Sequence, residues 1–469
     1  MNDTINDIVI PLAYLFAAAC FILALKWLSH PTTARRGVRV GEIGMAVAIV
    51  STLVDFRIVE YQWIVLALVL GTILGIPLGL VPMTAVPQRT ALSHAFGAFA
   101  AGVVGTAEYY LQQPDIETST MVAIGLEVVL GFLTFTGSLI AAGKLQGIVR
   151  DRPWIYKGQN IVNLTVLGSA LVLVGVLVAD PGNTILFPIV IGISLVFGFM
   201  MVIRIGGADM PTVISLLNSF AGLSASMMGF VLDNKLLIIA GALDGSSGLI
   251  LSIIMCRAMN RSFANVLFGG FGAEDVAGAG GVKQRPVRSV DPEETSFLLD
   301  AARSVIVVPG YGMAAAQAQH KVRELCDNLM KRGVDVKYAI HPVAGRMPGH
   351  MNVLLAEANV PYDQLYDLDS INSEFPQTDI VLVIGANDVV NPAARSDTTS
   401  PIYGMPILDV DQAGSIIVVK RSMRSGFAGV DNELFYLDKT QMLFGDAKTV
   451  IGEVIDELGR LPTREVAGV

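Results

Sequence analysis

Long apolar runs separated by short polar segments fill the first 260 residues. A membrane-spanning helix needs about 20 consecutive apolar residues, and runs of this length predict roughly nine spans. They lie near residues 8–28, 40–56, 62–82, 91–112, 120–142, 159–179, 184–204, 211–231 and 235–257. We therefore expect a multi-span α-helical membrane domain of about nine helices over residues 1–260.

The loops between these runs alternate in charge. One set is basic, with residues such as Arg35, Arg36 and Lys157, and the other is mainly acidic, with residues such as Asp115 and Asp180. Basic loops stay on the cytoplasmic side of a membrane. Nine spans then place the N-terminus outside and the C-terminal part in the cytoplasm.

A different pattern follows residue 295. Strand-like runs at residues 304–308, 334–340, 379–384 and 415–419 alternate with helical patterns at 313–332, 349–358 and 446–458. This βαβ alternation predicts an α/β Rossmann-like domain with a mainly parallel sheet over residues 296–469. The polar, small-residue stretch before it predicts a linker over residues 261–295.

Composition agrees with this division. The 469 residues are 53% hydrophobic and 16% charged, with a mean hydropathy of +0.59, which is too apolar for a wholly soluble protein. The net charge of −9 supplies no basic face for nucleic acid. Cys20, Cys256 and Cys326 have no disulfide or metal-site spacing, so we expect buried thiols and no metal centre.

The first strand of the α/β domain runs into a GxGxxA turn at residues 310–315 and then a predicted helix. In a dinucleotide fingerprint the first Gly, here Gly310, permits a tight turn, and the second, Gly312, lets the backbone approach a pyrophosphate. The third position, Ala315, packs the helix on the strand, and the helix N-terminus favours phosphate. These three residues are therefore candidates for cofactor binding.

The end of the second strand disfavours plain NAD. An NAD fingerprint places Asp or Glu there to bind the ribose 2'-hydroxyl, but residues 338–342 include no carboxylate. A 2'-phosphate needs cations instead, and Lys420, Arg421 and Ser422 follow directly on the strand near 415–419. The alternative interpretation of this basic group is a solvated strand end.

Three more residues lie after strands, at the edge where open α/β sheets bind ligands. Arg346 precedes a predicted helix and could clamp a phosphate. Asn387 and Asp388 end the strand near 379–384, and Asp388 is our candidate catalytic residue, with a turn-forming Asp as the alternative. The sequence has no second dinucleotide turn and no flavin or haem signature, so a redox partner must be another chain or a soluble substrate.

Ionisable side chains within spans are costly and mark candidate functional sites. His94 lies on a small, polar helical face of the fourth span, and imidazole changes charge readily near neutral pH, so we expect it to carry protons. Glu127 and Ser138 lie in the fifth span, and Asn218 lies on a polar face of the eighth. For stripes of only Ser, Thr or Asn, helix packing is the alternative.

Two aspartates complete this set. Asp209 stands at the start of the eighth span, two and a half helical turns from Asn218, so we expect it at the cytoplasmic mouth rather than on the face of Asn218. Asp244, in the ninth span, receives no role from the pattern.

Strings at residues 92–97, 207–211, 309–314, 344–352, 385–388 and 442–448 occur together in this order. Through them the chain resembles the beta subunit of proton-translocating NAD(P) transhydrogenase over essentially its whole length. The resemblance implies a membrane domain followed by an NADP(H)-binding domain, which works with a separate alpha subunit that binds NAD(H). It also implies direct hydride transfer from NADH to NADP+ while a proton moves inward, and we expect a dimer of alpha/beta units in lipid.

The resemblance implies roles for individual residues as well. Family proton-path residues match His94, Glu127 and Asn218, with Asp209 at the junction, and we place Ser138 on the same path. Family NADP-binding residues match Gly310, Gly312, Arg346, Asp388, Lys420, Arg421 and Ser422. Phe427 stands where many members have Tyr, which puts a hydroxyl contact there in doubt.

Two other classes of protein would also combine a membrane domain with a nucleotide-binding domain. A channel or transporter gated by a cytoplasmic nucleotide-sensing domain would need no redox chemistry, but the sequence has no TVGYG-like filter and its polar stripes are narrow. A quinone-linked dehydrogenase would need a flavin or metal site, for which the sequence shows no signature.

Overall fold

The computed structural model describes residues 8–54, 60–82, 85–150, 153–268, 285–426 and 428–462. The chain divides into two units, Met1–Gly206 with Val213–Ser252 and Gly207–Thr212 with Ile253–Val469. Residues 269–284 of the expected linker and Phe427 lie outside the described residues, so the predictions made for them stay predictions. The described remainder of that stretch includes a short helix, α11 (Phe263–Phe268), and the first elements of the α/β part, β1 (Arg288–Ser289) and the start of α12 (Pro292–Ala301).

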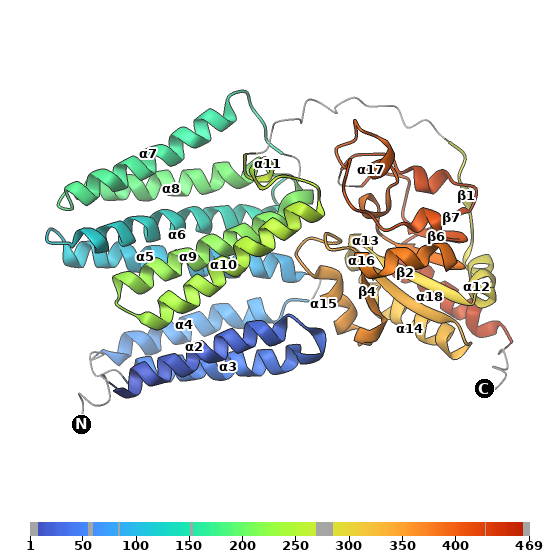
Figure 1. Ribbon diagram of the computed structural model, residues 1–469, viewed down its shortest axis with the longest axis horizontal. Coiled ribbons are helices and arrows are strands. Elements are labelled where there is room, and N and C mark those ends of the chain that lie inside the picture. The colour runs from blue at the N-terminus through green and yellow to red at the C-terminus, as the bar shows by residue number, and fades with distance from the viewer. Residues whose placement is uncertain are drawn as a thin grey trace. The chain divides into compact units, whose positions relative to one another are not determined.

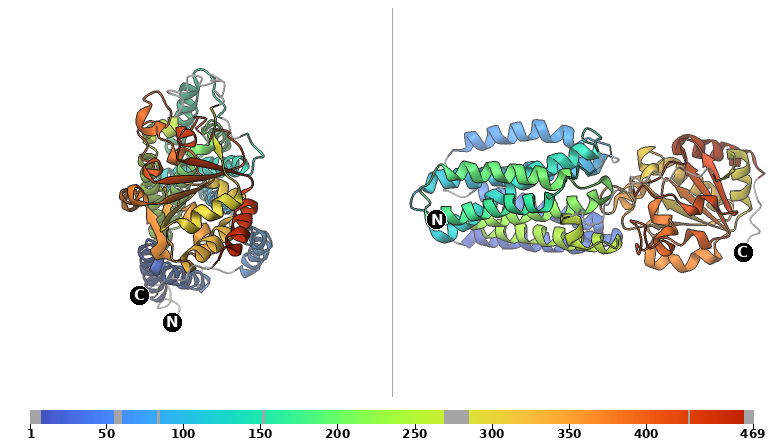
Figure 2. Two further views of the ribbon diagram at one scale, coloured as in Figure 1. Left: turned by 90° about the vertical axis from the view of Figure 1, so that its right-hand side faces the viewer. Right: turned by 90° about the horizontal axis from the view of Figure 1, so that it is seen from above.

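Nine long helices account for most of the described residues up to Ala258, and they lie along roughly the same axis (Figures 1 and 2). They are α2 (Ile10–Leu28), α3 (Pro31–Leu53), α4 (Tyr61–Gly79), α5 (Val86–Gln112), α6 (Thr118–Leu145), α7 (Gln159–Ala179), α8 (Leu186–Ile203), α9 (Met210–Val231) and α10 (Lys235–Ala258). Eight of these described helices are long and apolar enough to cross a membrane. The expected multi-span helical architecture is confirmed.

The helix that fails this criterion is α3, for which the sequence predicted a span near residues 40–56. It begins earlier, at Pro31, and ends at Leu53, so its N-terminal half carries a cluster of charged side chains. They are Arg35, Arg36, Arg39 and Glu42. The uncharged remainder, residues 43–53, is about half of the 20 residues that a span needs. By composition the described chain therefore has eight candidate spans, where about nine were expected.

Small residues bring these helices into backbone contact. A Cβ on Gly131 of α6 would lie 2.8 Å from the carbonyl oxygen of Ala98 on α5, and one on Gly198 of α8 would lie 2.1 Å from the carbonyl oxygen of Leu133 on α6. Such close approach favours helix association in lipid, where no hydrophobic force acts between helices. Helix α6 therefore packs closely against both α5 and α8.

Seven parallel strands form the sheet of the second unit. They are β1 (Arg288–Ser289), β2 (Ser304–Pro309), β3 (Asp335–Ile340), β4 (Leu365–Asp367), β5 (Ile380–Ile384), β6 (Ser415–Lys420) and β7 (Thr440–Phe444), in the order β1-β7-β6-β5-β2-β3-β4. The central strands β2, β5 and β6 are almost entirely buried, as expected for a sheet covered on both faces. The predicted Rossmann-like α/β fold with a parallel sheet is confirmed.

Helices α12 (Pro292–Ala301), α14 (Gln319–Lys331) and α18 (Ala447–Arg460) lie together on one face of this sheet (Figure 1). Helix α18 begins with Asp446, whose side chain accepts a hydrogen bond from the Lys448 N–H and so satisfies one of the unpaired amides of the first turn. Its buried residues recur at helical spacing and face the sheet.

The single helix predicted over residues 313–332 is wrong. The chain forms a short helix, α13 (Tyr311–Ala315), and then breaks before α14 at Gln317, which has a φ of 51°. This left-handed conformation is uncommon for a residue other than Gly, Asn or Asp. The run of alanines on either side continued the apolar pattern and concealed the break.

Candidate functional site

The order of the strands creates a switch point between β2 and β5. Counted from β2, the order β4-β3-β2-β5-β6-β7 is the 3-2-1-4-5-6 order of doubly wound dinucleotide-binding sheets. In such sheets, ligands bind outside the carboxyl ends of the two strands at which the order reverses. The turn after β2 and the loop after β5 are therefore the two loops that flank the candidate site.

These two loops are joined through their backbones. The Gly310 N–H donates a hydrogen bond to the Ile384 carbonyl (2.9 Å), and the Gly312 N–H donates one to the Gly385 carbonyl (3.0 Å). A Cβ on Gly310 would lie 2.4 Å from the Gly385 oxygen, and one on Gly312 would lie 2.6 Å from the Gly385 Cα. Gly385 itself has a φ of 66°. The glycines are thus required for contact between two turns, a role that the fingerprint did not predict.

Ala315 does not pack helix α13 on the sheet as expected. Its side chain is exposed, whereas Met313 and Ala314 are fully buried. Because α13 is only five residues long, Ala315 stands at its end rather than within a long helix. The packing function of the third fingerprint position therefore belongs to Met313 and Ala314.

The segment after β6 lies against the loop after β5. The Ala428 N–H donates to Asp388 Oδ2 (3.0 Å), and the Asn432 amide donates to the side-chain and main-chain oxygens of Asn387, both at 3.0 Å. A Cβ on Gly426 would lie 2.5 Å from Asp388 Oδ1. Asn387 and Asp388 thus hold residues 426–432 at the ligand edge of the sheet.

Lys420 and its neighbours begin this segment. Lys420 Nζ donates to the Arg424 carbonyl (2.7 Å) and lies 4.8 Å from the centre of the Phe435 ring. Burial lowers the pKa of Lys420, and the negative charge of Asp388 opposes this shift. Arg421 and Ser422 are exposed. Lys420 therefore stabilises the loop through the Arg424 carbonyl, while the side chain of Arg421 is exposed to solvent.

Arg346 lies in the loop that follows β3, beside the turn after β2. Its guanidinium carbon is 4.2 Å from the centre of the Tyr311 ring, and its backbone N–H donates to His350 Nδ1 (3.0 Å). Burial, followed by the charge of Arg346, lowers the pKa of His350 to about 4, so this histidine is neutral at pH 7. The third loop at the ligand edge thus places a cation next to the glycine turn.

His341 stands directly after β3, near the position where an NAD fingerprint has its carboxylate. Its Nδ1 accepts a hydrogen bond from the Val343 N–H (3.2 Å), so Nε2 carries the proton and donates to the Pro406 carbonyl (2.7 Å). The side chain is 1% exposed, and burial lowers its pKa to about 4. Both ring nitrogens are engaged by backbone, so His341 is a structural residue.

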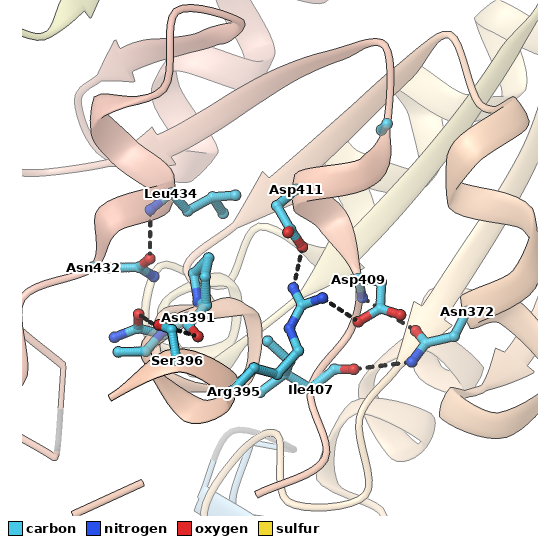
Figure 3. A network of polar contacts seen from close by, with 12 residues as sticks. Asn372, Asn391, Arg395, Ser396, Ile407, Asp409, Asp411, Asn432 and Leu434 are labelled. Carbon is cyan, nitrogen blue, oxygen red and sulfur yellow. Dashed lines mark hydrogen bonds and ion pairs between the residues drawn. The ribbon is translucent and has the colours of Figure 1, made fainter. Parts of the chain in front are cut away.

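A polar network holds the connection between β5 and β6 (Figure 3). Arg395 pairs with Asp409 (3.4 Å) and with Asp411, and Asn372 both donates to the Ile407 carbonyl (2.9 Å) and accepts from the Asp409 N–H (3.2 Å). No motif in the sequence pointed to this network, because its members are up to 39 residues apart, from Asn372 to Asp411. It ties the chain before β5, at Asn372, to the connection between β5 and β6.

In the first unit, Glu127 of α6 is fully buried against α5. A Cβ on Gly105 would lie 2.8 Å from the Glu127 carboxyl carbon, and neither carboxyl oxygen has a hydrogen-bond partner among the described residues. His94 Nδ1 and Ser138 Oγ are also buried without such a partner in that part of the chain. Buried polar atoms of this kind are normally satisfied by ordered water. Helices α5 and α6 therefore contain buried polar atoms of three predicted proton-path residues.

Helix α9 contacts both α10 and α6 through hydrogen bonds of its polar side chains. Asn218 Nδ2 donates to Asp244 Oδ1 on α10 (3.1 Å), and Ser224 Oγ donates to the Glu127 carbonyl on α6 (2.9 Å). Asp244, which the sequence left without a role, is thus the partner of a predicted proton-path residue. Ser219, whose hydroxyl donates to the Gly245 carbonyl (2.7 Å), fits the alternative of helix packing.

Asp209, just before α9, forms an ion pair with Arg261 (2.9 Å). Burial raises the pKa of Asp209, and the positive charge of Arg261 opposes this shift. Arg261 was not among the predicted site residues, since a sequence pattern does not show which cation lies beside which carboxylate.

Comparison with known proteins decides the family. The family model described as NAD(P) transhydrogenase beta subunit matches residues 10–457. The chain belongs to this family. Two relatives named NAD(P) transhydrogenase subunit beta, one from Rhodospirillum rubrum and one from a named strain of that species, are each 51% identical over 458 residues, which cover 95% of this chain and 98% of the relative.

Membership of the NAD(P) transhydrogenase beta subunit family implies NADP(H) binding and an alpha subunit as partner. The described residues fit such a cofactor at the ligand edge, where the glycine turn, the loop after β5, Arg346 and the exposed Arg421 surround the carboxyl ends of β2 and β5. The assignment of individual binding and proton-path residues stays a prediction.

Proposed function

We propose that this chain couples inward proton movement to direct hydride transfer from NADH, held by an alpha subunit, to NADP+ bound at the switch point of its own sheet. The observation that carries this proposal is the presence, in one member of the family, of a ligand edge built for a dinucleotide and of buried ionisable groups within apolar helices. Neither feature alone accounts for both the nucleotide-binding unit and the helical membrane unit.

NADP(H), when bound, supplies the hydride acceptor or donor. In our proposal the absence of side chains at Gly310 and Gly312 lets the pyrophosphate approach the backbone of this turn, and Ala315 lies at the far end of the same turn. Arg346 and Arg421 supply positive charge for phosphates, with Lys420 and Ser422 beside Arg421. Asp388 and Asn387 fix the loop that covers the ligand, so that the nicotinamide is held in one orientation.

Direct transfer sets the position of the alpha subunit. Two nicotinamides must come within about 3–3.5 Å for hydride transfer. The NAD(H)-binding partner therefore docks at the same edge of the sheet, where the loops after β2, β5 and β6 end. Metal ligands play no part in this proposal.

Protons cross, in this proposal, by way of Glu127, Ser138, His94 and Asn218, and Asp209 passes their protonation state to the nucleotide site. Exchange of hydride between NADH and NADP+ is nearly balanced by itself. One charge moved through 100 mV contributes about 2.3 kcal/mol, which shifts an equilibrium about 50-fold. A change of contacts at the Asp209–Arg261 ion pair would then open or close the NADP site.

We further propose a bacterial inner membrane location, with the N-terminus outside and the nucleotide domain in the cytoplasm, and a dimer of alpha/beta units. This orientation requires α3 to cross as a ninth helix. Its basic N-terminal half, with Arg35, Arg36 and Arg39, would then stand at the cytoplasmic face, which is the side that basic residues favour.

Sealed vesicles that contain the full chain and its alpha subunit test the proposed function. With NADH and an NADP analogue present, an imposed inward proton gradient is expected to raise the rate of analogue reduction several-fold, and an ionophore that collapses the gradient should abolish the increase. Reduction that is insensitive to the gradient would contradict the coupling. No reduction under any gradient would contradict hydride transfer itself and favour a gated channel.

Replacing Arg421 by Ala is expected to weaken NADP(H) binding about 10- to 100-fold and to leave NAD(H) binding unchanged. A hydrogen bond to a charged group is worth about 1.5–3 kcal/mol, and only NADP carries the 2'-phosphate. Titration of the full chain assembled with its alpha subunit, with each nucleotide in turn, measures the two affinities. Arg424→Ala is the matched control, because Arg424 is also an exposed basic residue of this segment. Equal weakening for both nucleotides would place Arg421 elsewhere than at the 2'-phosphate.

A further inference from the structure

Asp244 is the only ionisable residue in the middle of helix α10, and the proposed function does not use it. The other charged residues of α10 are Lys235 at its start and Arg257 near its end, about 14 Å and 20 Å from Asp244 by helix rise. Cys256 stands beside Arg257, and the neighbouring α9 contains no titratable side chain. A carboxylate in the middle of a span is costly and is retained for a function.

The contact between α9 and α10 fixes the partner of this carboxylate. A Cβ on Gly222 would lie 2.3 Å from the Gly245 nitrogen, and one on Gly248 would lie 2.9 Å from Asn218 Nδ2, so the two helices touch backbone to backbone at this level. Asn218 Nδ2 donates to Asp244 Oδ1 (3.1 Å) and is 3.5 Å from the Asp244 carbonyl oxygen. The close helix approach therefore aims the Asn218 amide at the carboxylate.

This pair lies near the depth of a proposed proton-path residue on α6. A Cβ on Gly137 would lie 3.0 Å from Leu217 Cδ2. Ser138 follows Gly137, and Asn218 follows Leu217, so Ser138, Asn218 and Asp244 stand close to one level across three neighbouring helices. Ser138 Oγ is fully buried and has no hydrogen-bond partner among the described residues. A polar layer thus extends from α6 through α9 to α10.

The carboxylate is also accessible. The Asp244 side chain is exposed on this chain, and among the described residues its carboxylate accepts a hydrogen bond from Asn218. A charged carboxylate at the middle of a bilayer is rarely in contact with lipid and instead faces a water-filled path or a polar group. Access to water is what a site that takes up and releases a proton requires.

Resting on the proposed function, we propose that Asp244 binds the translocated proton in the middle of the membrane and that Asn218 orients its carboxylate. A proton from water adds to a carboxylate oxygen by forming one O–H bond, and it leaves when the same bond breaks. The charge of Asp244 changes from −1 to 0 and back, and no electrons are transferred. The Asn218 amide holds one oxygen, so the other is the one that meets the incoming proton.

The test compares Asp244→Asn with Asp244→Glu in the full chain, assembled with its alpha subunit in sealed vesicles. Asp244→Asn keeps the size and the acceptor oxygen for Asn218 but does not bind the proton. It is expected to lower proton uptake and gradient-driven hydride transfer about 100-fold, while NADPH affinity stays within about twofold. Asp244→Glu should recover most of the lost rate. Ser246→Ala is the control, because among the described residues the exposed Ser246 hydroxyl donates a hydrogen bond within its own helix, to the Leu243 carbonyl (3.1 Å).

Two results would overturn the proposal. Retention of the wild-type coupled rate by Asp244→Asn would mean that no proton binds at this carboxylate. An equal loss of rate in Asp244→Asn and Asp244→Glu, together with a lower unfolding temperature of both variants, would make Asp244 a packing residue. Failure of the proposed function is distinguishable, because there the wild-type chain itself shows no effect of the gradient.

Discussion

Gly310→Ala is expected to weaken NADP(H) binding by about 100-fold or more. The added Cβ would lie 2.4 Å from the Gly385 oxygen and from the Ala386 Cα, both of which belong to backbone that cannot rotate away. The turn after β2 must therefore move from the loop after β5, which breaks the hydrogen bond from the Gly310 N–H to the Ile384 carbonyl (2.9 Å). A hundredfold loss corresponds to about 2.7 kcal/mol, which is within the range that overpacking costs.

Nucleotide titration and thermal unfolding of the same preparations separate binding from stability. Gly452→Ala is the matched control: Gly452 lies within α18, and nothing stands within 4 Å of its Cβ position. There the methyl group should stabilise the helix by about 0.4–1 kcal/mol. If Gly310→Ala bound NADPH as the wild type does, the dinucleotide would not lie at the switch point.

The candidate nucleotide site shows what local patterns predict well. Gly310 and Gly312 were recognised because a strand, two glycines and a helix start are close together in the sequence, and the four central strands were predicted to within about a residue. Gly385 was missed as their partner, since its pairing depends on β5 lying beside β2, and strand order is not a local property. The Arg346–Tyr311 contact was not predicted for the same reason, because it joins loops that follow two different strands.

Short strands and helix faces were harder to predict. β1 has two residues and β4 has three, so neither contains a periodic pattern, and each is a strand only because a longer neighbour pairs with it. In the membrane unit, residue spacing placed Asn218 on a polar stripe of α9. Only the register between α9 and α10 shows that Asp244 is opposite to it. The apolar run near residues 40–56 also predicted a membrane span, but the helix there, α3, begins at Pro31 and carries charged residues in its first half.

His94→Ala is expected to abolish proton-coupled hydride transfer, with a loss of about 100-fold or more, and to leave NADP(H) affinity within about twofold of the wild type. The imidazole is the one histidine side chain within the helices long and apolar enough to span, and its Nδ1 is buried without a hydrogen-bond partner among the described residues. A positioned acid–base group contributes about 10²–10⁴-fold to a proton-transfer step. Its removal should therefore act on proton transfer and not on nucleotide binding.

The register of α5 and α6 shows which polar groups of α6 stand near the level of His94. These helices are antiparallel, since Gly105 lies against Glu127 while Ala98 lies against Gly131. The level of His94 is then that of Ser138, a hydroxyl that can relay a proton but does not hold a charge near pH 7. Glu127 is about 16 Å away along α5, by the helix rise from His94 to Gly105.

The experiment measures both proton uptake and hydride transfer in sealed vesicles that contain His94→Ala. The control is Ser93→Ala, because Ser93 is an exposed neighbour of His94 in α5. Full coupling in His94→Ala would show that protons cross by another route.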